Sequence, residues 1–127
     1  MAQWKSNREE EIKIYTFSID KLNEENTRYW FSMIKDQLNA QVCWNVIEFY
    51  QAVGEEAFNS IIQMDKDWNR INLKAMMVMN VGLNKSMKME ISKYHHTGQR
   101  WNHLKKKFLK SSNSKKMDKL MRMSNWT

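Results

Sequence analysis

The chain has 127 residues, a length typical of one domain, with 42% hydrophobic and 28% charged residues, as in an ordinary globular protein. No apolar run approaches the roughly 20 residues that a membrane-spanning helix needs, the first residues lack the apolar stretch of a signal peptide, and the single cysteine, Cys43, excludes an internal disulfide and a cysteine-rich zinc site. With no proline and only three glycines, the sequence excludes a Gly-rich phosphate loop and favours a helical bundle over a multi-stranded β fold.

The net charge of +7 is distributed unevenly along the chain. Residues 1–84 carry 9 Lys/Arg and 12 Asp/Glu, whereas residues 85–127 carry 12 Lys/Arg and 2 Asp/Glu. An asymmetry of this kind favours either a nucleic-acid-binding face or charge-complementary contacts between copies of the chain.

The first 16 residues differ from the rest of the sequence in composition. Residues 1–16 are charged and mixed, and we expect an N-terminal arm or a short helix there, followed by one helical domain over 17–127. The alternation of apolar and polar residues over 15–19 fits either a short extended segment or the end of a helix.

The first predicted helix covers 27–40. Trp30 and Leu38 lie on one apolar stripe with the helical repeat. Asn26 or Thr27 is the expected N-cap, since short polar side chains accept a hydrogen bond from the first free backbone N–H groups.

Two shorter helices are expected next. The first covers 42–53, carries Cys43 on an apolar face where a buried, inert thiol is usual, and ends at Gly54. A short helical segment over 55–63 follows.

The most apolar predicted helix covers 66–84. Its apolar residues lie on nearly all sides, and this pattern predicts a helix buried at the centre of the domain. Asp65 or Asp67 is the expected N-cap.

The C-terminal third is predicted to form three more helical segments. They cover about 86–94, then 98–110 with Thr97 as its N-cap, and finally a helix that begins at Ser114. The buried stripe of the middle segment consists of Trp101, Leu104 and Phe108.

Four segments, in this order, resemble the N-terminal part of the Gag polyprotein of copia-type LTR retrotransposons. They are the Lys-Leu-Asn…Asn…Trp entry over 21–30, the Leu…Gln…Trp-x-Val-Ile run over 38–47, Trp68 followed by Lys74-Ala75, and the Thr…Trp…Leu…Phe helix over 97–108 with its serine-rich link. Glu24 stands where the family has glycine, and Thr27 where it has tyrosine. The residues that carry the resemblance are Leu22, Asn26, Trp30, Leu38, Trp44, Trp68, Trp101, Leu104 and Phe108.

The resemblance implies an all-α, capsid-type domain that assembles into the shell of a virus-like particle around RNA. A whole Gag continues into a second helical half and often a zinc knuckle, and neither is present in this sequence. The resemblance therefore implies a capsid N-terminal half, a truncated Gag or a host gene derived from one, located in cytoplasmic particles or in the nucleus.

The leading hypothesis is a structural module that makes weak, repeated contacts with copies of itself or with intact Gag. We expect no enzymatic activity, cofactor, metal, small-molecule substrate or membrane partner. A host-retained fragment that interferes with capsid assembly is one alternative, and a small RNA-binding module is another. The basic residues that would serve RNA or assembly, unless they form only a solvated helix face, are Lys105, Lys106, Lys107, Lys110, Lys115, Lys116, Lys119 and Arg122.

Two sharper interpretations of individual residues are weighed against simpler ones. Trp30, Trp44 and Trp101 would suit base stacking on unpaired nucleotides, but their in-phase apolar neighbours favour core positions. The histidines at 95, 96 and 103 do not predict a metal site with Cys43, because no acidic ligand lies nearby in the sequence.

Overall fold

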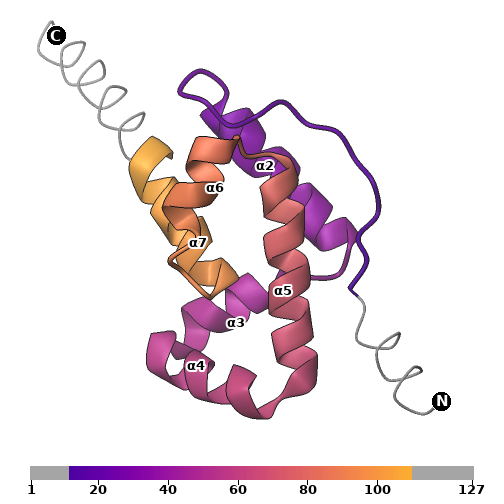
Figure 1. Cartoon of the computed structure of the whole chain (residues 1–127), viewed down its shortest axis with the longest axis vertical. Coiled ribbons are helices and arrows are strands. Elements are labelled where there is room, and N and C mark those ends of the chain that lie inside the picture. Colours follow the sequence, from indigo (N-terminus) through magenta and orange to yellow (C-terminus); the bar gives the residue numbers. More distant parts are fainter. Residues whose placement is uncertain (1–11, 110–127) are drawn as a thin grey trace, which may run out of the picture.

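The structure, a computed structural model, describes residues 12–109, and over this range the chain is entirely helical apart from its connecting segments. Six α-helices and a terminal π-helical turn form one bundle (Figure 1). The prediction of an all-α bundle with five or six helices is therefore confirmed for the described part of the chain. The helix expected from Ser114 onward lies outside the described residues.

The helix boundaries follow the predicted ones closely. In chain order the elements are α2 (Thr27–Ala40), α3 (Asn45–Val53), α4 (Glu55–Met64), α5 (Lys66–Val81), α6 (Lys85–Ile91), α7 (Thr97–Leu104) and the π-helix η1 (Lys105–Leu109). Three helices differ from the prediction by three residues at one end: α5 and α6 end three residues earlier than expected, and α3 begins three residues later. The late start of α3 follows from a turn over 41–44, with Val42 at a φ of 57°. Cys43 thus precedes the helix instead of lying on it.

An extended segment, 12–23, precedes α2 and runs along the outside of the bundle beside this helix (Figure 1). The buried side chain of Gln41 holds this segment through the two backbone polar groups of Tyr15. The Tyr15 N–H donates to Gln41 Oε1 at 2.8 Å, and Gln41 Nε2 donates to the Tyr15 carbonyl at 3.2 Å. Further along, the Leu22 N–H donates to the carbonyl of Gly82 at 2.9 Å. The extended alternative for this segment is the one that the structure adopts.

Two helices begin at side-chain caps. Asp65 Oδ1 accepts from the N–H groups of Asp67 and Trp68, so of the two candidate caps for α5 it is Asp65 that serves. Asn84 Oδ1 accepts from the Met87 N–H at 2.8 Å and caps α6, a role that the sequence analysis did not assign. At the end of α3, Gly54 has a φ of 87° and terminates the helix as expected.

The other two expected caps make no capping bond: Asn26 has the N-cap position of α2, as predicted, without a side-chain bond to the helix, and Thr97 is not at the N-cap position of α7. Asn26 stands at the start of α2 without capping it, because its Oδ1 accepts from the Asn23 N–H, and its amide donates to the Lys21 carbonyl. Thr97 is the first residue inside α7, and its hydroxyl bonds to Asn72 instead. In both cases the side chain has found a partner outside the helix that it was expected to cap.

The core lies between α2, α3, α5 and α7, and α5 was expected to be buried all round. Instead α5 buries one face, while Leu73 and Met77 on the opposite face are 40% and 38% exposed. A domain of this size has too little chain to cover a central helix on every side. The fully buried large side chains include Trp30, Ile34, Leu38, Phe58, Met79 and Leu104.

A buried asparagine on α5 fixes where α7 begins. Asn72 is 1% exposed, and its Oδ1 accepts from the backbone N–H of Thr97 at 2.8 Å and from the Thr97 hydroxyl at 2.9 Å. Its amide group donates to the His95 carbonyl at 3.0 Å. These bonds satisfy polar groups that burial would otherwise leave unpaired, and they join α5 to the α6–α7 link.

Candidate functional site

Helix α7 packs closely against α3, and a glycine of α7, Gly98, makes this close approach possible. A Cβ on Gly98 would lie 2.3 Å from Cδ1 of Tyr50, so a side chain at this position would push the two helices apart. Gln99, one residue later, donates to Glu55 Oε1 at 2.6 Å. The N-terminal turn of α7 therefore lies beside the start of α4, and the helix runs from there toward η1.

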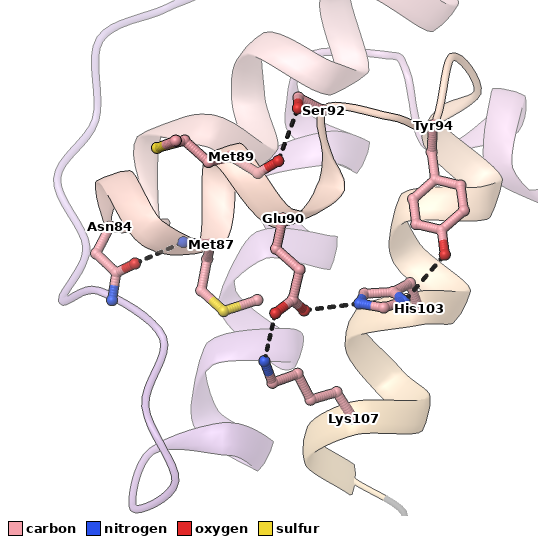
Figure 2. A network of polar contacts seen from close by, with 8 residues as sticks. All are labelled: Asn84, Met87, Met89, Glu90, Ser92, Tyr94, His103 and Lys107. Carbon is pink, nitrogen blue, oxygen red and sulfur yellow. Dashed lines mark hydrogen bonds and ion pairs between the residues drawn. The ribbon is translucent and has the colours of Figure 1, made fainter.

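A carboxylate on α6 joins this helix to the far end of α7 and to η1 (Figure 2). Glu90 Oε2 lies 2.7 Å from His103 Nε2, and Glu90 Oε1 lies 2.7 Å from Lys107 Nζ. The Tyr94 hydroxyl lies 3.3 Å from the other ring nitrogen of His103, Nδ1. We call these four residues the Glu90 clasp.

Both ring nitrogens of His103 have a hydrogen-bond partner in the clasp. In the tautomer with a proton on Nε2, His103 donates to Glu90 while Nδ1 accepts from the Tyr94 hydroxyl, so every polar atom of the ring has a partner. Hydrogen bonds from Lys107 and then from His103 lower the pKa of the Glu90 carboxyl below its ordinary value. The clasp therefore contains a carboxylate that stays ionised and holds two basic side chains.

The hydroxyl, imidazole and carboxylate of the clasp are groups that also occur in catalytic relays, but their surroundings here are open. The side chains of His103 and Glu90 are 25% and 35% exposed, and the adjacent hollow is lined with Lys93, Lys106 and Lys107. What the arrangement does in the fold is to fix the rotation of η1 relative to α6.

Because of the clasp, the three described lysines of the basic run differ in whether they have an ion-pair partner. Lys105, Lys106 and Lys107 are exposed, as their positions around the buried stripe predict, but Lys107 is paired with Glu90. Within residues 12–109, no ion pair involves the other two lysines. The remaining predicted basic residues, Lys110, Lys115, Lys116, Lys119 and Arg122, lie outside the described residues.

An open groove with an aromatic floor runs between α2, α3 and α7, with a volume of about 860 Å³. Its rings are Phe31, Trp44 and Trp101, which pack edge to face: the centroid of Trp101 lies 5.1 Å from that of Phe31 and 5.1 Å from that of Trp44. Lys35 Nζ lies 4.8 Å from the centroid of the Trp44 ring. We call this feature the aromatic groove.

The rim of the groove is polar. Gln51 Nε2 on α3 donates to Asn102 Oδ1 on α7 at 2.6 Å and so joins the two helices along one wall. Ser32, Glu48 and Lys105 also line the groove. The sequence analysis did not identify this site, because it needs helices from distant parts of the chain; the available signal was the position of Trp44 to the side of its apolar stripe.

The residues that carry the family resemblance divide into two classes of burial. Leu22, Trp30, Leu38, Trp101 and Leu104 are buried, whereas Trp44, Trp68 and Phe108 are half-buried and pack against the core. Asn26 is half-buried as well and lies directly before α2. Trp44 was expected to be a core residue and instead lines the aromatic groove.

Cys43 and His96 are the other side chains with catalytic or metal-binding chemistry that the structure buries. Burial raises the pKa of the Cys43 thiol to about 11, so the thiol is protonated and inert as expected. Burial lowers the pKa of His96, which favours its neutral form. Within the described part of the chain, no three His, Cys, Asp or Glu side chains come together as metal ligands, and no helix there is both long and apolar enough to cross a bilayer.

Comparisons with protein-family models, with curated proteins and with solved structures find no match to this chain. The resemblance to copia-type Gag therefore stays a prediction that rests on the sequence motifs.

Proposed function

We propose that this protein is a structural module that associates head to tail with copies of itself, as a capsid-type Gag domain would. The observation that carries the proposal is the placement of opposite charges at the two ends of α7. The contact is between unlike surfaces, so it repeats from copy to copy and can close into a ring or extend into a shell.

One end of the molecule is acidic. Glu55 and Glu56 begin α4, while Asp65 and Asp67 lie at the turn into α5; all four are exposed, with Lys66 the one cation among them in the sequence. Gln99 places the start of α7 against Glu55. We call these four carboxylates the acidic end; α4 and the start of α5, which carry them, lie at the bottom of Figure 1.

The other end is basic. From 84 to 109 the chain has seven Lys/Arg and one acidic residue, whereas from 12 to 83 it has seven Lys/Arg and nine acidic residues. Two of these cations, Lys93 and Arg100, lie near the start of α7, and Lys93 lines a hollow with Glu55 and Glu56. The basic end therefore consists of Lys105 and Lys106. Lys105 and Lys106 directly follow the C-terminal end of α7, which has eight residues and is therefore about 12 Å long. This basic end is thus separated from the acidic end by the length of the helix, and a single copy cannot pair the two.

Sedimentation velocity of the full chain tests the proposal. At about 0.05 M salt, where charges act over more than ~10 Å, we expect assemblies that grow with protein concentration, and at about 0.5 M salt we expect monomers. The double substitutions Glu55→Lys with Glu56→Lys, and Lys105→Glu with Lys106→Glu, should each abolish the assemblies.

A matched control separates this contact from a general effect of net charge. Glu24→Lys with Glu25→Lys makes the same change of charge in an exposed turn before α2 and should leave association unchanged. Monomers of the wild-type chain at low salt and high concentration would contradict the proposal, as would equal losses in the control and in the end variants.

A further inference from the structure

The aromatic groove has an exposed feature that the head-to-tail contact does not use. Phe31 and Trp101 are 6% and 5% exposed, and so form the floor, but Trp44 is only half-buried. Trp44 packs against Trp101 at an interplanar angle of 76°, an edge-to-face arrangement in which the two rings do not stack on each other, and part of the Trp44 side chain stays exposed. Lys35, an exposed and flexible side chain, is the one described cation over that ring.

The charges around the groove favour an anionic occupant. Lys35 on α2 and Lys105 on η1 line it from two sides, against one carboxylate, Glu48. The Glu90 clasp contributes to this arrangement, because it holds Lys107 toward α6 (Figure 2) while Lys105, two residues earlier, lines the groove.

We propose that the aromatic groove binds single-stranded nucleic acid, with a base against Trp44 and the phosphate backbone beside Lys35 and Lys105. Stacking on an aromatic side chain suits every base, and a cationic rim follows the backbone without reading its sequence. The volume of about 860 Å³ lies within the range of about 300–1,000 Å³ that is usual for sites holding a small molecule. Ser32 and Gln51 supply polar groups within the same groove for the edge of a base.

A nucleic acid fits these observations better than a segment of protein does. A helix seated in the groove would need an apolar face over the rings and acidic residues over the two lysines. The described exposed apolar residues of α5, Leu73 and Met77, have Lys74 between them, so that face would bring a like charge to Lys35 and Lys105.

Fluorescence anisotropy with a labelled oligouridylate of about twelve nucleotides tests the proposal on the full chain. Trp44→Leu, which keeps apolar bulk without the aromatic face, should weaken binding about tenfold or more, as the loss of one stacked base does. Lys35→Gln should lower the slope of log affinity against log salt by about 0.7, the value for one phosphate contact to a single strand.

The control for the second variant is Lys85→Gln, which removes an exposed charge on α6 away from the groove and should leave the slope unchanged. Because Lys35→Gln leaves the rings intact, the proposal stays testable if Trp44→Leu unfolds. Lys105 is omitted because it also belongs to the basic end.

Three results would overturn the proposal: no binding of the oligonucleotide, equal effects of Lys35→Gln and Lys85→Gln, or binding of duplex as tight as that of the single strand. A fourth result that would overturn it comes from sedimentation velocity in the absence of nucleic acid. If Trp44→Leu abolishes self-association and leaves oligonucleotide binding unchanged, the groove receives a second copy of the chain. Self-association and nucleic-acid binding are measured in separate samples, so either can fail alone.

Discussion

A single buried asparagine ties the start of α7 to α5. Replacing Asn72 with Ala leaves the buried backbone N–H of Thr97 without its acceptor and the His95 carbonyl without its donor. Since each unsatisfied buried group costs about 1–3 kcal/mol, we expect the free energy of unfolding to fall by about 2–4 kcal/mol in urea denaturation. Asn69→Ala, at an exposed position on the same helix, should change it by less than about 0.5 kcal/mol. Equal effects of the two variants would show that the Asn72 bonds do not stabilise the fold.

The Glu90 clasp makes stability depend on pH in a defined direction. The pKa of Glu90 is lowered in the folded chain, first by Lys107 and then by His103, so the unfolded chain binds the proton more readily. The stabilisation is complete above the ordinary glutamate pKa, and it is lost as the pH falls through the lowered value.

Glu90→Gln should therefore lower the melting temperature slightly at pH 7, by the equivalent of about 0.5 kcal/mol, because an exposed ion pair contributes little. The difference from wild type should shrink as the pH falls toward about 3. Glu56→Gln, whose carboxylate lies at the exposed acidic end, is the control and should not reproduce this convergence. A difference that grows on acidification would contradict the assignment of Glu90 as the ionised centre of the clasp.

At the scale of the elements, the structure shows which of two aspartates, Asp65 or Asp67, caps α5, a choice that the sequence left open. Asp65→Ala removes the side chain that accepts from the Asp67 and Trp68 N–H groups and should cost about 1 kcal/mol. Asp67→Ala removes only a favourable charge near the start of α5, and it should cost about 0.5 kcal/mol or less. Thermal melts followed by circular dichroism measure both, and the reverse order would assign the cap to Asp67.

The helices were predictable because their signals are local. The repeat of Trp30, Ile34 and Leu38, the stop at Gly54 and the acidic residues before α5 all act within a few neighbouring positions. The caps at Asn26 and Thr97 were not, because each side chain bonds to a group outside its own helix. Polarity alone marks these residues as capable of capping, and only tertiary structure decides which partner they take.

The surfaces were less predictable than the helices. Trp44 has the apolar neighbours of a core residue, yet it lines the groove because α2, α3 and α7 do not close over it. The clasp joins residues 13 and 17 positions apart, a pairing that depends on how α6 and α7 lie together. The uneven charge, in contrast, is visible in the sequence, and the structure adds that Glu55 lies beside Gln99 at the start of α7, whereas Lys105 and Lys106 follow its last residue.

For the whole molecule, complementation between two variants tests the central claim of head-to-tail association most directly. Glu55→Lys with Glu56→Lys gives a copy with two basic ends, and Lys105→Glu with Lys106→Glu gives a copy with two acidic ends. Each should be monomeric alone at low salt, whereas an equimolar mixture should form alternating assemblies in sedimentation velocity, since every contact again joins opposite charges. A mixture that stays monomeric, while both variants keep their helical circular dichroism and the wild type assembles, would contradict the proposed contact.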